Sequence, residues 1–357
     1  MIQNLKKLKY LPALVKKHKI TEATFFITDI CNMKCKHCFV LDALNKKLPM
    51  LAPEEIRKMG EFVKPIQRVH VGGGEPFTRK DLFEVVQAFS EAWQPGVICI
   101  PNNGWFTKRI LDFIERYGET CKGNLRLHFS INSPYPDDMD NFTELRGSFA
   151  KWKESITKAI KLAEKYNNIT IVALSTYNEH NQHSFKELID YLHQEIKVPD
   201  FSFQIARTHG DYKPELDYDL FRELTDYYFK KYNKQDRFIS TFRKLSRKKS
   251  VEYFEDPKFS STCTSGKLRV VISPTGDVYP CEKLGYPNLK DMSKWLMGNI
   301  RDYDFNLNEL LKNADSKSCY DKICGTNCHC DHNIDQSLRL LSSGEYRKEL
   351  IKGVLTG

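Results

Sequence analysis

Three cysteines lie close together near the start of the chain, and their spacing suits a metal site. Cys31, Cys35 and Cys38 are separated by three residues and then by two. A [4Fe–4S] cube bound by three thiolates would have a fourth iron open to a small molecule. Zinc is an alternative, with His37 as a fourth ligand, although zinc usually takes ligands in closely spaced pairs. A disulfide framework is less expected, because the chain has eleven cysteines, an odd number.

A second segment of interest contains three glycines, Gly72, Gly73 and Gly74, and then Glu75. It directly follows the short expected strand Arg68–Val71. Glycine lets the backbone approach a ligand closely and tolerates positive φ. A tight turn between a strand and a helix would use the same residues, so this run is weak evidence by itself. Its position one strand after the cysteines predicts that both segments serve one site.

The cysteine triplet and the Gly-Gly-Glu-Pro segment resemble those of the radical S-adenosylmethionine (SAM) enzymes. His37 fills the position just before the third cysteine, where that family has an aromatic residue. The resemblance implies that the open iron chelates SAM and that an electron from the cluster cleaves it. The resulting 5′-deoxyadenosyl radical would take a hydrogen atom from substrate, while the segment Gly72–Glu75 would bind the methionine amino group.

Further SAM contacts are expected at the ends of later strands. The segment around Ser130 and Asn132 resembles the family's Ser-Ile-Asp-Gly-Pro segment, with asparagine in place of aspartate. Turn chemistry would explain these residues equally well. Arg207 could clamp a carboxylate in two places, although a surface salt bridge is a close alternative. Which side chain is catalytic stays open. The predicted cofactor-binding residues are His37, Gly72, Gly73, Gly74, Glu75, Ser130, Asn132, Thr176, Asn178 and Arg207.

A second group of cysteines lies near the C-terminus: Cys263, Cys281, Cys319, Cys324, Cys328 and Cys330. With four residues between Gly276 and Cys281, this region resembles the SPASM and twitch extensions of radical SAM enzymes. The resemblance implies at least one auxiliary [4Fe–4S] cluster. Its favoured ligands are Cys263, Cys281, Cys328 and Cys330, with Cys319 and Cys324 left open. Six cysteines cannot form two four-cysteine clusters, and zinc stays an alternative for this region.

Short β-rich runs alternate with helical ones between these two groups. The expected strands are Ala23–Ile27, Arg68–Val71, Val97–Ile100, Leu125–Phe129, Ile169–Leu174 and Phe201–Ala206. Six strand–helix units predict a parallel sheet, open or curved into an incomplete barrel. Ligands bind such folds where the strands end, and the cysteine triplet follows the first strand. With the resemblance, this predicts an α/β fold: a partial (β/α)6 barrel of the radical SAM type with a small cysteine-rich C-terminal domain.

The expected organisation has five parts. They are a basic N-terminal helical segment at 1–19, the barrel at 20–215, a helical connector at 216–262, the iron–sulfur domain at 263–335 and a helical tail at 336–357. No apolar run approaches a membrane span, and residues 1–20 do not resemble a secretory leader, so a cytoplasmic protein is expected. Contact of residues 1–19 with a membrane surface is a weaker alternative, and nucleic-acid binding is not expected.

The expected activity is that of a radical SAM oxidoreductase or related enzyme that oxidises or rearranges a small polar molecule such as a sugar. Only thirty residues precede Cys31, which argues modestly against a peptide substrate with a leader. Peptide or protein side-chain modification is therefore the second reading, and a non-catalytic iron–sulfur or zinc scaffold is the third. The implied cofactors are SAM, its [4Fe–4S] cluster and the auxiliary cluster. The implied partner is an electron donor such as flavodoxin or ferredoxin.

Overall fold

The computed structural model describes residues 20–206, 212–232, 237–255, 265–266, 268–282, 295–314 and 348. The predicted segments at 1–19 and at 315–335, and all but residue 348 of the predicted tail, lie outside the described residues. So do six predicted site residues: Arg207, Cys263, Cys319, Cys324, Cys328 and Cys330. The helices of the described part are either too short or too polar to cross a membrane.

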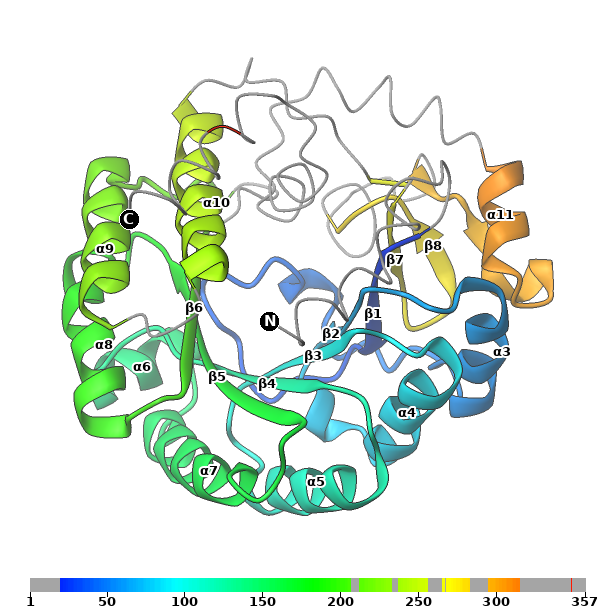
Figure 1. Ribbon diagram of the computed structural model, residues 1–357, viewed down its shortest axis with the longest axis horizontal. Helices are drawn as coiled ribbons and strands as arrows, with labels where there is room; N and C mark the ends of the chain where they lie inside the picture. The colour runs from blue at the N-terminus through cyan, green and yellow to red at the C-terminus, as the bar shows by residue number, and fades with distance from the viewer. Residues whose placement is uncertain are drawn as a thin grey trace.

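The centre of the fold is one sheet whose described strands run in the order β6-β5-β4-β3-β2-β1-β7-β8-β9. The first six are parallel and curve into an open horseshoe (Figure 1). They are β1 Glu22–Thr28, β2 Arg68–Gly73, β3 Val97–Asn102, β4 Leu125–Ser130, β5 Ile169–Tyr177 and β6 Asp200–Ile205. The predicted partial (β/α)6 barrel is confirmed.

Helices cover the outer face of this horseshoe, as expected for right-handed crossovers between parallel strands (Figure 1). They are α3 Pro53–Val63, α4 Leu82–Ala88, α5 Thr107–Thr120, α7 Ser148–Ala163 and α8 Phe185–Tyr191. Short 3-10 or π-helices complete the connections: η2 Leu41–Ala43, η3 Pro76–Thr78, η4 Phe89–Trp93, η5 Gln182–Ser184 and η6 Leu192–Ile196. One further helix, α6 Pro136–Thr143, was not expected from the sequence.

Successive side chains of each strand point to opposite faces of the sheet, one toward the outer helices and one toward the inside of the barrel. In β4, Leu125, Leu127 and Phe129 are fully buried among the core residues packed under the helices. The alternate residues Arg126 and His128 therefore face the inside of the barrel. Each large apolar side chain buried in this way contributes about 1.5–3 kcal/mol to folding, so the helix-facing side of the sheet holds the barrel together.

Paired charges occupy the inside of the barrel near the amino ends of the strands. His70 Nε2 lies 2.6 Å from Glu22 Oε1, and Asp200 is bound by Arg126 and by Arg243, the latter at 2.9 Å. Burial alone would raise the pKa of Asp200, but the two guanidinium groups lower it overall. These side chains bind one another and fill this end of the barrel. We therefore expect a ligand site at the opposite end.

The C-terminal part extends the same sheet. β7 Arg269–Ile272 pairs parallel with β1, and β8 Asp277–Tyr279 and β9 Gly298–Asn299 continue the sheet antiparallel. β7 and β8 thus form a hairpin whose turn ends at Gly276. The remaining described elements are α9 Tyr218–Lys231, α10 Arg237–Glu255, η8 Ile300–Tyr303 and α11 Leu307–Asn313. The pairing of β1 with β7 joins the expected barrel to the expected iron–sulfur domain in one sheet. The limits of the domains stay predictions.

Candidate cofactor-binding site

The cysteine loop leaves β1 at its carboxyl end and is fixed by backbone hydrogen bonds. The Cys31 N–H donates to Asn45 Oδ1 at 3.1 Å. On the far side of the loop, the N–H groups of Lys34 and Lys36 donate to the last carbonyls of α6, at 3.0 and 3.2 Å. The loop is thus held between the first strand and a helix some hundred residues later in the chain. These contacts position all three thiols at the carboxyl end of the barrel.

The three thiols are free and largely buried. None of Cys31, Cys35 and Cys38 forms a disulfide. Burial raises the pKa of Cys31 to about 12, and burial likewise raises the pKa values of Cys35 and Cys38. The charges of Glu75 and Cys38 raise the pKa of Cys31 further. Three thiolates are therefore unfavourable here without a nearby positive charge, and the irons of a bound cluster would supply it.

The geometry fits a cluster better than a single zinc ion. Among the described residues, no three His, Cys, Asp or Glu side chains converge where one metal ion could be held. A [4Fe–4S] cube takes each cysteine at a different iron, so its ligands need not converge. His37, considered above as a zinc ligand, stacks on Phe142 with ring centroids 5.0 Å apart. The residues present at the triplet fit a [4Fe–4S] cluster.

The glycine run packs directly against the end of β1. A Cβ on Gly73, whose φ is +123°, would lie 2.2 Å from the Thr28 carbonyl oxygen. A Cβ on Gly74 would lie 2.2 Å from the carbonyl oxygen of Ile30, whereas one on Gly72 would meet only an ordinary contact at 3.7 Å. This packing explains why positions 73 and 74 lack a side chain, and the expected contact of the glycines with a ligand stays a prediction. Gly73 and Gly74 let the backbone approach the start of the cysteine loop.

Two backbone hydrogen bonds join the same segments. The Gly74 N–H donates to Thr28 O and the Glu75 N–H donates to Ile30 O, both at 2.8 Å. The structure therefore brings the cysteine loop and the glycine segment together, as the sequence analysis expected.

Arg79 anchors this region from beneath. Its guanidinium donates to Ile27 O at 2.8 Å and to Leu51 O at 2.6 Å, and it pairs with Asp81 at 2.7 Å. Thr78 and Asp81 have the spacing of a capping box before α4, but Asp81 makes no side-chain cap and binds Arg79. The buried arginine ties the end of β1 to the chain before α3.

Glu75 is buried beneath the glycines and links two strand ends. Its carboxylate accepts hydrogen bonds from the N–H of Phe77 at 3.0 Å and from that of Asn103 at 2.7 Å. Burial raises the pKa of Glu75 to about 7, although both hydrogen bonds act in the opposite direction. Asn103 in turn donates from Nδ2 to Asn32 Oδ1 at 2.8 Å, inside the cysteine loop.

Asn103 is a site residue that the sequence analysis missed. The available signal was its position: Asn102, Asn103 and Gly104 follow β3 directly, and polar residues after other strands were singled out for that reason. Asn102 also turns back, because its Oδ1 accepts the Gly104 N–H at 3.0 Å. The end of β3 therefore belongs to the site together with the ends of β1 and β2.

The ends of β4 and β5 carry the other predicted SAM contacts. Ser130 is the half-buried last residue of β4. Asn132 Oδ1 accepts the Thr176 N–H at 3.2 Å, and Asn178 donates from Nδ2 to Thr176 O at 2.8 Å. Asn178 is fully buried, so its hydrogen bonds position the backbone of β5. The structure brings all four residues to the carboxyl end of the barrel, and their contacts with SAM stay predictions.

Cys281 is the one described member of the C-terminal cysteine group. It follows β8 and is buried in an apolar cluster that includes Phe26 and Tyr279. Cys31 and Cys38 pack against the same cluster. The structure therefore places Cys281 near the first cysteine loop, although more than two hundred residues separate them in the sequence.

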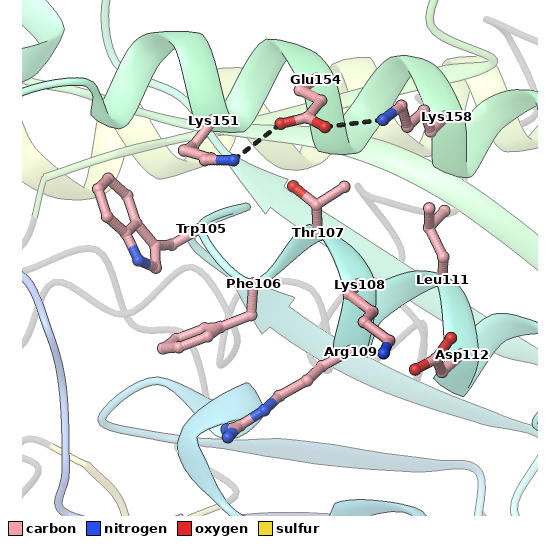
Figure 2. A pocket seen from close by; sticks show the side chains of 10 residues that line it. All are labelled: Trp105, Phe106, Thr107, Lys108, Arg109, Leu111, Asp112, Lys151, Glu154 and Lys158. Carbon is pink, nitrogen blue, oxygen red and sulfur yellow. Dashed lines mark hydrogen bonds and ion pairs between the residues drawn. The ribbon is translucent and has the colours of Figure 1, made fainter.

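A shallow groove of about 550 Å³ lies between α5 and α7 (Figure 2). Its charges are largely matched, since Glu154 binds both Lys151 at 3.0 Å and Lys158 at 2.7 Å. Trp105 lies at one end of the groove, and its backbone N–H donates to Asn103 Oδ1 at 3.0 Å. None of the predicted site residues lines this groove, which meets the site through the Trp105 backbone.

Comparisons with known proteins agree with this site. The model of the Radical SAM superfamily matches residues 25–192. GTP 3′,8-cyclase of Alkaliphilus metalliredigens is 30% identical over 170 residues, 45% of this chain and 50% of that protein. The antilisterial bacteriocin subtilosin biosynthesis protein AlbA of Bacillus subtilis is 24% identical over 265 residues, 72% of this chain and 54% of that protein. The chain thus spans about half the length of these curated relatives.

Two solved structures share the fold over most of the chain. Streptococcus suis SuiB bound to precursor peptide SuiA has a TM-score of 0.60 at 17% identity, covering 91% of this chain and 71% of that one. Native anSMEcpe with bound AdoMet and Cp18Cys peptide has a TM-score of 0.61 at 17% identity, covering 94% and 96%. Residues 25–192, just under half of the chain, therefore match the radical SAM superfamily, whose cofactors are a [4Fe–4S] cluster and SAM.

Proposed function

We propose that the chain is a radical SAM enzyme that modifies a peptide or protein side chain. The observation that carries the proposal is the set of three buried, free thiols at the carboxyl end of β1, locked against the glycine segment of β2. When bound, the cluster and SAM supply a 5′-deoxyadenosyl radical that removes a hydrogen atom from substrate. Members of the superfamily are enzymes, which argues against the scaffold reading.

The chain's own residues divide the work. Cys31, Cys35 and Cys38 hold the cluster, and the segment Gly72–Glu75 receives the amino group of SAM. His37, Ser130, Asn132 and Thr176 are the proposed further contacts with SAM. Asn178 supports the β5 backbone from below. Glu75 holds the end of β3 against the end of β2 and would thereby position the backbone that binds SAM.

The sequence alone favoured a small polar substrate, and the comparisons change that order. Both solved structures cited above contain a peptide, and AlbA takes part in making the bacteriocin subtilosin. The GTP cyclases match over less than half of this chain, whereas the peptide-bound structures cover more than nine tenths of it. The small molecule therefore becomes the second candidate.

The auxiliary cluster belongs to the proposal as well. Cys281 is buried beside the first cysteine loop, so a cluster that it ligates would lie next to the reaction site. Cys263, Cys328 and Cys330 are the proposed further ligands, and Cys319 and Cys324 are not assigned. Such a cluster would accept an electron from the substrate or anchor it. A reduced flavodoxin or ferredoxin is the proposed donor to the first cluster.

Anaerobic reconstitution followed by reduction with dithionite and addition of SAM tests the reaction. The wild-type chain should form 5′-deoxyadenosine. The triple substitution of Cys31, Cys35 and Cys38 by alanine should abolish it and lower the iron content by about four per chain. Cys121→Ala is the matched control, because Cys121 lies between α5 and β4 and should leave both readouts unchanged. Cleavage of SAM by the triple variant would refute the assignment of the loop.

The substrate class needs a separate experiment. Candidate peptides and sugars, each deuterated at the carbon positions to be tested, are incubated with the reconstituted enzyme and SAM. Transfer of deuterium from a peptide into 5′-deoxyadenosine is the expected result. Transfer from a sugar and from none of the peptides would overturn the peptide proposal and leave the SAM chemistry standing.

A further inference from the structure

The orientation of the Asn32 side chain follows from a chain of hydrogen bonds. A backbone N–H can only donate, so Asn103 Oδ1, which receives the Trp105 N–H at 3.0 Å, is the acceptor end of that amide. Asn103 Nδ2 must then be the donor to Asn32 at 2.8 Å. The atom of Asn32 that receives it is therefore Oδ1. This leaves Asn32 Nδ2, with its two N–H groups, on the other side of the amide.

This amide nitrogen is buried and makes no hydrogen bond among the described residues. A buried donor left unpaired destabilises a protein by about 1–3 kcal/mol, so such donors usually face a group that accepts them. Asn32 follows Cys31 directly, and its partner Asn103 is bound to Glu75, whose charge acts on Cys31 and Cys35. The unpaired donor thus lies in the cysteine loop, one residue from Cys31.

We propose that Asn32 Nδ2 donates a hydrogen bond to a sulfur atom of the [4Fe–4S] cluster bound by Cys31, Cys35 and Cys38, with Asn103 as the positioning residue. The proposal rests on the proposed function for the cluster itself. It adds a role for Asn32 that needs no contact with SAM or substrate.

The hydrogen bond would tune the reduction potential of the cluster. One-electron reduction adds a negative charge to the cluster and its sulfurs, and an N–H donor stabilises the more negative form more strongly. Removing the donor should therefore make the cluster harder to reduce. Asn103 acts through Asn32, because its own polar groups are already engaged by Glu75, Asn32 and Trp105.

The test is a redox titration of the reconstituted protein without SAM, followed by the EPR signal of the reduced cluster. Asn32→Leu keeps the shape of the side chain and removes the donor. We expect the equilibrium constant for reduction to fall about tenfold, a shift of 59 mV to more negative potential for a one-electron couple. Asn45→Gly is the control. It removes the acceptor of the Cys31 N–H, and φ at this position is +61°, which glycine tolerates.

A second measurement needs no substitution at the site. Wild-type protein labelled with ¹⁵N in the asparagine side-chain amides should show a ¹⁵N coupling to the reduced cluster by electron–nuclear double resonance, and Asn32→Leu should lose it. An unchanged potential in a variant that holds its cluster, an equal shift in Asn45→Gly, or a wild type without the coupling would overturn the inference. A shift seen only when SAM is present would assign the donor to SAM and also overturn it. If the wild type binds no cluster at the triplet, the proposed function fails instead.

Discussion

Replacing Glu75 by glutamine should remove a pH-dependent loss of stability. In the folded chain burial raises the pKa of Glu75 to about 7, whereas an exposed glutamate has a pKa near 4.3. Below the unfolded pKa both states are protonated and the group favours neither. Between the two values the folded state holds the proton and the unfolded state does not, so stability falls as pH rises through this range. Above about pH 7 the loss is complete.

The size of the effect follows from the same two values. A difference of two to three pKa units corresponds to about 3 kcal/mol. Glutamine is neutral throughout. Its amide oxygen can accept from one of the two N–H donors, Phe77 or Asn103, which bind different oxygens of Glu75, and its NH2 group cannot accept from the other. That loss is the same at every pH, so the stability of Glu75→Gln relative to the wild type should rise by about 3 kcal/mol between pH 5 and pH 8.

Urea denaturation of the metal-free, reduced protein at pH 5, 6, 7 and 8 measures this difference. Glu55→Gln is the control, because its pKa behaves oppositely: burial alone would raise it, but hydrogen bonds from Arg301 and the Ala52 N–H lower it overall. The difference between Glu55→Gln and wild type should stay level over this range. If the difference between Glu75→Gln and wild type is also level from pH 5 to pH 8, the argument about the buried carboxylate is wrong.

Two other pairs of substitutions test how the loop is held. Gly74→Ala should destabilise the chain by about 2 kcal/mol or more and reduce iron uptake, because the new Cβ would lie 2.2 Å from the Ile30 carbonyl oxygen. Gly72→Ala should cost under about 1 kcal/mol, and equal effects by urea denaturation would contradict the packing argument. Arg79→Met should destabilise by about 2–6 kcal/mol, about 1–3 for each of two buried backbone oxygens that lose their donor. Asp81→Asn, at a side chain 42% exposed, should cost under about 1 kcal/mol in the same assay.

The strands could be located from the sequence because parallel strands buried on both faces form nearly continuous apolar runs. The run Val97–Ile100 lies inside β3, and Ile169–Leu174 lies inside β5. Their order and the position of the cysteine loop follow from rules of connection and strand ends. This was enough to predict the barrel and to place the first site at its mouth.

Other features depend on tertiary contacts that no local pattern records. Helix α6 has few large apolar residues, and it matters because its last carbonyls receive the N–H groups of the cysteine loop. The role of Asn103 depends on Glu75 having a second carboxylate oxygen facing β3. The need for glycine at positions 73 and 74 depends on the way the end of β1 passes behind β2. The sequence showed that these residues were unusual and could not show what they touch.

The pairing of β1 with β7 has a consequence for attempts to cut the chain into pieces. β1 sits between β2 and β7, and the residues from Glu22 to Phe25 are matched by a strand that comes some 240 residues later. A truncated chain ending at the expected boundary near residue 262 would leave that side of β1 bare. Its unpaired N–H and C=O groups would form an exposed edge strand that can pair with strands of other chains, so the truncated barrel should aggregate. The first strand of the barrel therefore gains its second neighbour only after about three quarters of the polypeptide has been made.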